Sequence, residues 1–297
     1  MIIELIKQDL HGVSPKSITD FRIINAKSGV HVYKCVYDGT PAVVKYFENE
    51  GDRREILNYK ILARHNIPTI IPLVLGTASL LMEDISVSEH WRLGIAEDLQ
   101  DIDVAKSLAR WYFTFHENGT AVPELDTLYF EYDSINEKNL NKLIQKFPEA
   151  AELFQFVLIR LEKFRKLIYQ PSFTLTYNDF YWTNLAVRKD KQAAMMFDYN
   201  LLGRGYRFSD LRNVSWSMPG DARMAFTDEY NRLYFDKHGH SRTEAEQAER
   251  ISNVAAPLFA LIVAFLERES FPSWAENEKN EAVNGNFLLN AKHLLGE

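Results

Sequence analysis

Short hydrophobic runs separated by polar and turn residues characterise the first third of the chain, a pattern typical of β-strands. Three such runs, rich in Val, Ile and aromatic residues, lie at Phe21–Asn25, Val30–Tyr37 and Pro41–Phe47. The dipeptide Asp38-Gly39 separates the last two runs and is typical of a two-residue hairpin turn. The pattern therefore predicts a small sheet with antiparallel strands near the start of the chain.

One helix and a second hairpin complete this region. Apolar residues recur at helical spacing between Asp52 and His65. Leu73–Gly76 and Ser79–Ile85 are again strand-like. We therefore expect residues 1–85 to form a small β-rich lobe, with the helix inserted between its third and fourth strands.

Residues 86–297 follow instead the 3.6-residue period of amphipathic helices. One hairpin interrupts this pattern, with strands at Leu185–Arg188 and Ala193–Phe197 around a polar turn. The predicted fold class is therefore α+β, with a larger, mostly helical second lobe joined directly to the first. The predicted helices of this lobe are Asp103–His116, Glu149–Tyr169, Arg223–Lys237, Glu244–Leu266 and Asn277–Leu295.

Two polar residues, Asp179 and Asn184, stand in the otherwise aromatic and apolar segment TYNDFYWTNLAV, just before this hairpin. A buried polar group without a partner costs roughly 1–3 kcal/mol, so we expect these two to have a function or to remain in contact with water. A turn centred on the polar residues of the hairpin would place Asn184 opposite Phe197 or Asp198, with Asp179 entering from the preceding loop. Two carboxylates and an amide oxygen are ligands that a hard cation such as Mg²⁺ prefers.

The residues Tyr177, Asn178, Asp179, Asn184 and Asp198 resemble the catalytic loop of small-molecule kinases related to aminoglycoside phosphotransferases and choline kinases. That loop reads H-G-D-x-x-x-x-N and is followed by a strand, a turn, a strand and a second aspartate. The resemblance implies a protein-kinase-like fold of two lobes. It also implies that Asp179 accepts or orients the acceptor hydroxyl, while Asn184 and Asp198 hold magnesium on the nucleotide phosphates.

The resemblance extends into the first lobe. It implies that Lys45, at the end of an apolar strand, grips the α and β phosphates of ATP or GTP, and that Glu55 on the following helix positions this lysine. Main-chain groups near Glu83–Ile85 would bind the adenine. Ser28 and Gly29 belong to the loop that would cover the phosphates.

The sequence departs from the family pattern at three places. The loop at 26–31 should be rich in glycine but contains only Gly29. Tyr177 and Asn178 replace a His-Gly pair. We expect Tyr177 to supply the aromatic packing of the His, and Asn178 to adopt a positive φ, which Asn tolerates better than most residues. Residues 198–200, Asp-Tyr-Asn, replace the Asp-Phe-Gly of protein kinases.

Three functions compete. The leading hypothesis is a phosphotransferase that uses ATP or GTP and acts on a hydroxyl of an aminoglycoside, a sugar or an amino alcohol. A protein kinase is less favoured, because only about a dozen residues separate Asp198 from Asp210, which leaves no room for an activation loop. The third is a catalytically silent binding or scaffold protein, which the lost glycines and the missing His favour. The residues whose joint presence favours the enzyme are Lys45, Glu55, Asp179, Asn184 and Asp198.

The composition of the chain argues against some classes of binding partner and indicates a cellular compartment. The formal net charge of −7 and the pI of about 5.7 argue against nucleic acid as a main partner. The single cysteine, Cys35, excludes an internal disulfide and fits a reducing compartment. No signal peptide is evident, and the apolar segment Val254–Leu266 is too short to span a bilayer. We therefore expect a cytoplasmic protein without membrane contact, and leave the acceptor and the oligomeric state open.

Overall fold

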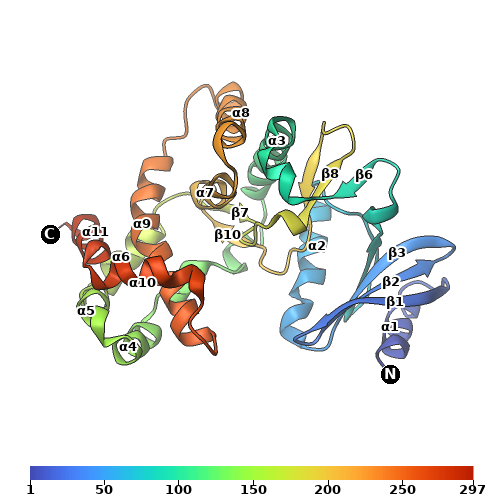
Figure 1. The fold of residues 1–297 in the computed structure, drawn as a ribbon, viewed down its shortest axis with the longest axis horizontal. Helices are drawn as coiled ribbons and strands as arrows, with labels where there is room; N and C mark the ends of the chain where they lie inside the picture. The colour runs from blue at the N-terminus through green and yellow to red at the C-terminus, as the bar shows by residue number, and fades with distance from the viewer. Residues whose placement is uncertain (297) are drawn as a thin grey trace. The chain divides into compact units, whose positions relative to one another are not determined.

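The computed structural model describes residues 1–296, and the chain divides into two compact units (Figure 1). The first unit contains Met1–Leu125, Leu175–Leu202 and Leu211–Ser241, and the second contains the intervening segments and the chain from Arg242 onward. The lobe boundary at residue 85 lies inside the first unit. The division into lobes at that position stays a prediction.

The first unit begins with a five-stranded antiparallel sheet, which confirms the predicted N-terminal hairpins. Asp38 and Gly39 both have positive φ, 50° and 79°, as a two-residue turn of the predicted kind requires. Helix α2 (Arg54–Arg64) follows the third strand, as predicted. The strands in spatial order are β1 (Ile18–Lys27), β2 (Val30–Tyr37), β3 (Thr40–Phe47), β5 (Ser79–Glu83) and β4 (Pro72–Leu75).

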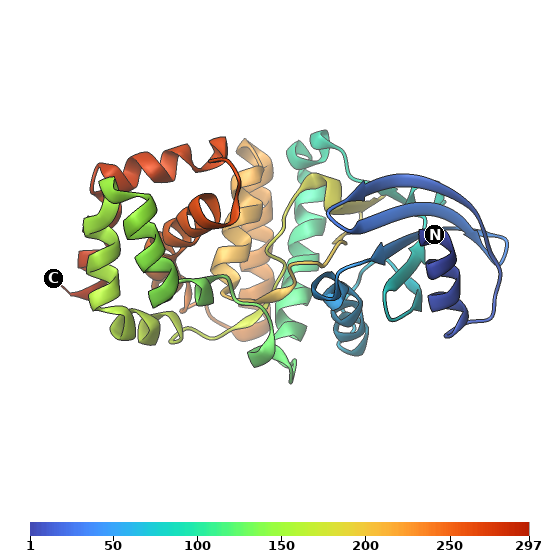
Figure 2. The same ribbon diagram turned by 90° about the horizontal axis from the view of Figure 1, so that it is seen from below.

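A helix that the sequence reading missed, α1 (Ile2–His11), lies beside this sheet (Figure 2). Its side chains Ile6 and Leu10 are buried in one cluster with Val44 and Leu81 of the sheet. The four-residue spacing of Ile6 and Leu10 is the helical period, so the signal was present in the sequence.

The rest of the first unit is a three-stranded sheet and two long helices. Strand β6 (Trp91–Leu93), which was not predicted, pairs with β8 (Leu185–Arg188), and β8 pairs with β9 (Ala194–Met196). Helices α3 (Ile102–Gly119) and α8 (Gly220–His238) confirm two predicted helices. Strand β7 (Thr174–Thr176) and helix α7 (Arg207–Ser217) each begin in the second unit and end in the first.

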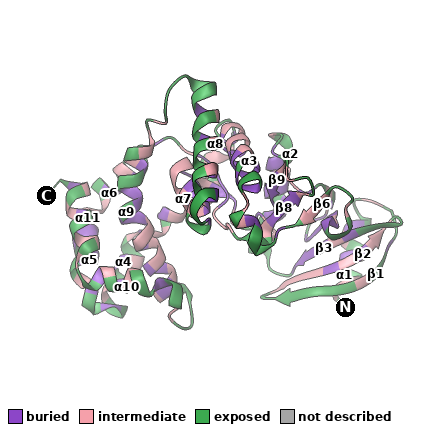
Figure 3. Ribbon diagram, turned by 45° about the horizontal axis from the view of Figure 1, so that its top comes forward, coloured by how far each residue is buried: buried purple, intermediate pink, exposed green. Residues whose placement is uncertain are grey.

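The second unit is helical, and its core lies along α9 (Ala245–Ile262), where Figure 3 shows buried residues. Phe154, Phe164 and Leu258 are among its buried side chains. A short strand, β10 (Gly203–Gly205), bridges to Tyr129. The helices are α4 (Glu137–Lys146), α5 (Ala151–Ile159), α6 (Leu161–Ile168), α9 (Ala245–Ile262), α10 (Glu276–Val283) and α11 (Asn286–Leu295).

Two of the predicted long helices are each two helices. The stretch predicted as Glu149–Tyr169 is interrupted at Arg160, where no proline or glycine marks the break. The stretch predicted as Asn277–Leu295 is interrupted before α11 by Gly285, whose φ is +80°. A residue in this left-handed conformation ends an α-helix.

The apolar segment Val254–Leu266 lies at the end of the predicted helix Glu244–Leu266, which the structure confirms as α9 and the turn that follows it. Helix α9 continues through a π-helical turn at Val263–Glu267. The resulting 23-residue stretch, Ala245–Glu267, is long and apolar enough to cross a membrane by length and composition alone. Within the second unit, however, Val254 and Leu258 are almost fully buried, as in the core helix of a globular domain.

Candidate active site

Lys45 and Glu55 form a buried ion pair. The ammonium Nζ of Lys45, on β3, lies 2.7 Å from Oε2 and 2.9 Å from Oε1 of Glu55, on α2. Lys45 is 8% exposed and Glu55 is 1% exposed. Because a buried charge is costly without a partner, these two residues depend on each other. The structure thus brings together the two residues that the sequence reading paired.

Asp198 joins this pair as a second carboxylate. Its Oδ1 lies 3.0 Å from Nζ of Lys45, so one cation lies between two anions. Burial alone would lower the pKa of Lys45, but the charges of Glu55 and Asp198 outweigh it and raise the pKa above its ordinary value. Lys45 therefore stays protonated at neutral pH. Burial also raises the pKa of Glu55, and the charge of Lys45 opposes this effect.

The hairpin that carries Asp198 has one of the two predicted registers. Leu185 pairs with Met196 in the β8–β9 ladder. One step further, the Phe197 N–H donates to the carbonyl of Asn184 at 3.0 Å. Asn184 therefore lies opposite Phe197, and Asp198 follows immediately at the open end of the hairpin.

Asp179 and Asn184 are in contact at the same end of the hairpin. The Nδ2 of Asn184 lies 3.4 Å from Oδ2 of Asp179 and 3.3 Å from its main-chain oxygen. Burial, and then the charge of Asp198, raise the pKa of Asp179 above its ordinary value, against the hydrogen bond from Asn184 that lowers it. A carboxylate with a raised pKa is a better proton acceptor than a solvated one.

The two residues in the place of the His-Gly pair also contact this segment. Asn178 has a φ of +63°, as predicted, and its Nδ2 donates to the carbonyl of Leu201 at 3.0 Å. Tyr177 is fully buried, and its ring makes edge contacts with the rings of Trp111 and Tyr199. Its hydroxyl donates to the carbonyl of Phe197, a bond that the sequence reading did not foresee.

Ser28 and Gly29 form the tight turn between β1 and β2, both with positive φ (53° and 82°). Two hydrogen bonds join this turn to the residues that follow β3. The Glu48 N–H donates to the carbonyl of Gly29 at 2.9 Å, and Nδ2 of Asn49 donates to the carbonyl of Ser28 at 3.3 Å. A Cβ at Gly29 would come within 2.6 Å of the Asn49 amide nitrogen. The positive φ therefore favours glycine here, whereas the Asn49 side chain alone would have to move to make room for a Cβ.

The segment predicted to bind adenine follows β5. Glu83 ends that strand opposite Ala42, and Ile85 begins a short 3₁₀ turn. Between them, the buried carboxylate of Asp84 accepts a hydrogen bond from the Ser86 N–H at 2.9 Å. The conformation of this connection is thus held by a buried side chain.

The donor set at the mouth of the hairpin fits a hard cation. Within residues 1–296 there is no group of three or more His, Cys, Asp or Glu side chains arranged to hold a metal ion. Asp198, Asn184 and the neighbouring Asp179 nevertheless offer carboxylate and amide oxygens, which suit Mg²⁺. Mg²⁺ commonly takes only one or two protein ligands and completes its shell with water and substrate phosphates.

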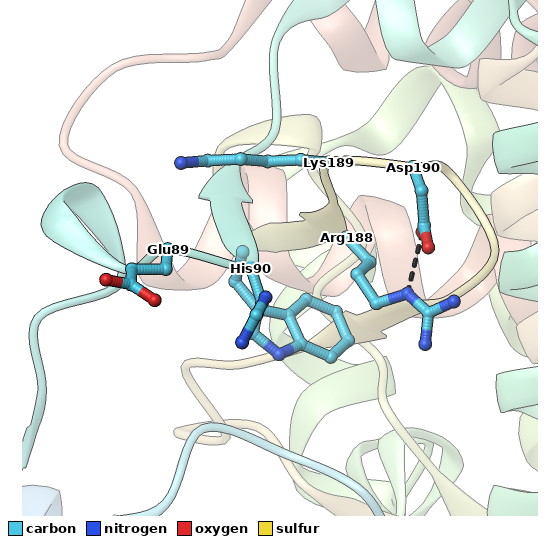
Figure 4. Close-up of a pocket in the computed structure, with 6 residues that line it drawn as sticks. Glu89, His90, Arg188, Lys189 and Asp190 are labelled. Carbon is cyan, nitrogen blue, oxygen red and sulfur yellow. Dashed lines mark hydrogen bonds and ion pairs between the residues drawn. The ribbon is translucent and has the colours of Figure 1, made fainter.

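A hollow of about 580 Å³ lies at the other end of the hairpin (Figure 4). Its lining combines the start of β6 and the two residues before it with the end of β8 and the turn that follows. Arg188 and Asp190 are joined there by a 2.6 Å ion pair. Because these residues flank the turn and not the open end, the hollow is separate from Asp179 and Asp198. The lining residues are Glu89, His90, Trp91, Arg188, Lys189 and Asp190.

The chain belongs to the phosphotransferase enzyme family, whose model matches residues 20–246. This match confirms the family resemblance of the catalytic loop. No curated protein sequence matches the chain.

Several solved structures have the same fold. A macrolide 2′-phosphotransferase from Brachybacterium faecium is 15% identical, with a TM-score of 0.60, and the match covers 95% of this chain and 97% of that one. A choline/ethanolamine kinase family protein from Mesorhizobium loti is 12% identical, with a TM-score of 0.61 and full coverage of both chains (100% each). A spectinomycin phosphotransferase in complex with ADP and spectinomycin is 13% identical, with a TM-score of 0.53 and 97% coverage of both. At these identities the likeness establishes the fold, and it confirms the predicted kinase-like α+β class.

Proposed function

We propose that the protein is a kinase that moves the γ-phosphate of ATP or GTP to a hydroxyl group of a small molecule. The observation that carries this proposal is the position of Lys45 Nζ between the carboxylates of Glu55 and Asp198. A binding protein without catalysis has no need to bury this charge cluster next to a second acidic residue, Asp179. The cluster therefore weighs against a silent scaffold.

Each residue has a distinct proposed role. Lys45 aligns the α and β phosphates, and Glu55 holds its ammonium group in place. Asn184 and Asp198 would hold Mg²⁺, which neutralises charge on the phosphates when bound. Asp179 orients the acceptor hydroxyl and takes its proton, a role that its raised pKa supports.

The acceptor is proposed to be a small hydroxylated compound of the aminoglycoside, sugar or amino-alcohol type. The connection between Asp198 and the start of α7 at Arg207 is short, which leaves no room for the long loop that binds protein substrates in protein kinases. The matched structures include enzymes named for a macrolide and for spectinomycin, both small molecules. In the same proposal the protein acts in the cytoplasm, without nucleic acid or membrane as a partner.

The first test is turnover of ATP and GTP, with and without Mg²⁺, against a panel of aminoglycosides, sugars and amino alcohols. Asp179→Asn should lower kcat by about 10²-fold or more, the scale of a lost general base, and leave the nucleotide Kd within a few-fold of the parent value. Asp190→Asn, at the exposed hairpin turn, is the matched control and should leave kcat unchanged. Equal turnover in Asp179→Asn and the parent would remove Asp179 from the mechanism.

The second test separates the two proposed metal ligands. Asp198→Asn keeps the size of the side chain but removes its charge, so activity should collapse at ordinary Mg²⁺ concentrations. Asn184→Ala removes a neutral ligand that water can replace, so raising Mg²⁺ should restore part of the activity. The proposal fails if Asp198→Asn keeps the Mg²⁺ dependence of the parent protein.

A further inference from the structure

Beyond Phe197, the segment that carries Asp198 is no longer paired with a strand, and side chains hold several of its carbonyls. Strand β9 ends at Met196, and the carbonyls after it accept hydrogen bonds from side chains elsewhere in the first unit. Nδ2 of Asn58, on α2, donates to the carbonyl of Tyr199 at 2.7 Å. Nδ2 of Asn178 donates to the carbonyl of Leu201 at 3.0 Å.

The hydroxyl of Tyr177 lies against the backbone of Asp198. It donates to the carbonyl of Phe197 and lies 3.3 Å from the carbonyl of Asp198 itself. Burial raises the pKa of Tyr177 well above its ordinary value, so the hydroxyl remains a donor throughout the physiological pH range. These two carbonyls belong to the peptide groups before and after the Cα of Asp198.

The backbone of Asp198 needs such support. Its φ is +64°, a left-handed conformation that is uncommon for residues other than glycine. Strained backbone of this kind persists only where the surroundings determine it. The direction of the Asp198 carboxylate, towards Lys45, depends on that conformation.

We propose that Tyr177 is a positioning residue for Asp198: its buried hydroxyl holds the left-handed backbone that directs the Asp198 carboxylate towards Lys45 and the metal position. The inference rests on the proposed function for its catalytic consequence. In the place of the His, Tyr177 supplies aromatic packing, as predicted, and its hydroxyl also donates to this backbone.

The test compares Tyr177→Phe with Tyr206→Phe. Both variants remove one buried hydroxyl that donates to a backbone carbonyl, since the Tyr206 hydroxyl donates to Ile168 at 2.6 Å in the second unit. Tyr177→Phe should raise the Mg²⁺ concentration for half-maximal turnover by about five- to tenfold, the scale of one lost hydrogen bond. Tyr206→Phe should leave that concentration unchanged, although its thermal unfolding midpoint falls similarly. Tyr177→His, which keeps a donor, should recover part of the parent Mg²⁺ dependence.

Amide hydrogen exchange provides a readout that does not need activity. The Phe197 and Leu202 amides are hydrogen-bonded within this segment, to the carbonyls of Asn184 and Tyr199. They should exchange about five- to tenfold faster in Tyr177→Phe and at the parent rate in Tyr206→Phe.

Unchanged exchange at both amides in Tyr177→Phe would overturn the inference. Faster exchange with an unchanged Mg²⁺ requirement would also overturn it, because Tyr177 would then be structural only. If the parent protein turns over no nucleotide, the proposed function fails, whereas the exchange experiment still decides whether Tyr177 holds Asp198.

Discussion

Lys45 contacts two acidic residues from distant parts of the chain, and only one of these contacts was predicted. The pairing with Glu55 follows from a strand lysine and a glutamate on the next helix. The 3.0 Å contact with Asp198 joins residues 153 positions apart, which no local pattern reveals. In the described structure the proposed phosphate-binding group and a proposed metal ligand are therefore in direct contact.

The Lys45–Glu55 pair leads to a prediction about nucleotide use. Lys45→Ala should lower kcat/KM for ATP by roughly ten- to hundredfold, because a charge-assisted contact to phosphate is lost. Glu55→Ala should cause part of the same loss, and the double variant should resemble Lys45→Ala alone, since the two act as a unit. Arg64→Ala, which breaks an exposed ion pair with Glu124 at the end of the same helix, is the control. Strictly additive losses in the double-mutant cycle would mean that Lys45 and Glu55 do not cooperate.

Two substitutions at Asn178 separate the effect of its backbone conformation on stability from the effect of its hydrogen bond to Leu201. Asn178→Gly loses the bond to Leu201 but adopts the +63° φ freely. Asn178→Ala loses the same bond and must also hold a left-handed backbone. The free energy of unfolding of the Ala variant should therefore be lower than that of the Gly variant by about 0.5–1 kcal/mol, after the greater unfolded-state entropy of glycine is allowed for. Urea denaturation measures this difference, and an Ala variant as stable as the Gly variant would contradict it.

Among the elements, hairpins were predicted better than helix breaks. The strands β2 and β8 were predicted to the residue, because each is a short run rich in apolar residues that ends at polar turn residues. The break between α5 and α6 has no Gly or Pro, and β6 is only three residues long, so neither has a local signal. The bond of Tyr177 to Phe197 was also beyond the sequence, because it depends on how close two loops lie after folding.

The contact between helix α1 and the β4–β5 turn leads to a prediction about the pH dependence of stability. Asp9, on α1, accepts hydrogen bonds from the Thr77 N–H (2.9 Å), the Thr77 hydroxyl (2.5 Å) and the Ala78 N–H (3.0 Å) in the β4–β5 turn. Burial alone would raise the pKa of Asp9, but these bonds outweigh it and lower the pKa below its ordinary value. Asp9→Ala should therefore reduce the free energy of unfolding by roughly 1–3 kcal/mol at pH 7.

The sign of the pH effect follows from the lowered pKa. The stability that ionised Asp9 contributes is fully present above its unfolded pKa, about 3.9, and is lost as the pH falls through the folded value. The difference between the parent and Asp9→Ala should thus be constant near neutral pH and shrink below about pH 4. Glu4→Ala, on the exposed side of the same helix, is the control for lost charge. A difference that stays constant down to pH 2 would show that the Asp9 charge is not involved.

At the scale of the whole molecule, the fold class and the family were both predictable. The division into lobes at residues 1–85 and 86–297 stays a prediction, and the structure shows two compact units that are each assembled from separate stretches of the chain. Every residue proposed for the nucleotide, the metal and the base lies in the first unit. In the sequence, the segment Asp126–Thr174 of the second unit separates the site residues up to Ile85 from those that begin at Asp179.

This interleaving has a consequence for biosynthesis. Lys45 leaves the ribosome long before Asp198, and the segment Asp126–Thr174 is made between them. A growing chain that has completed only the N-terminal sheet carries Lys45 and Glu55 without their third partner. Contacts of such long sequence separation form late, because closing the intervening loop costs entropy before the contact is gained. The complete active site should therefore be among the last parts of the protein to form, and a nascent chain ending before residue 198 should lack the contact between Lys45 and Asp198.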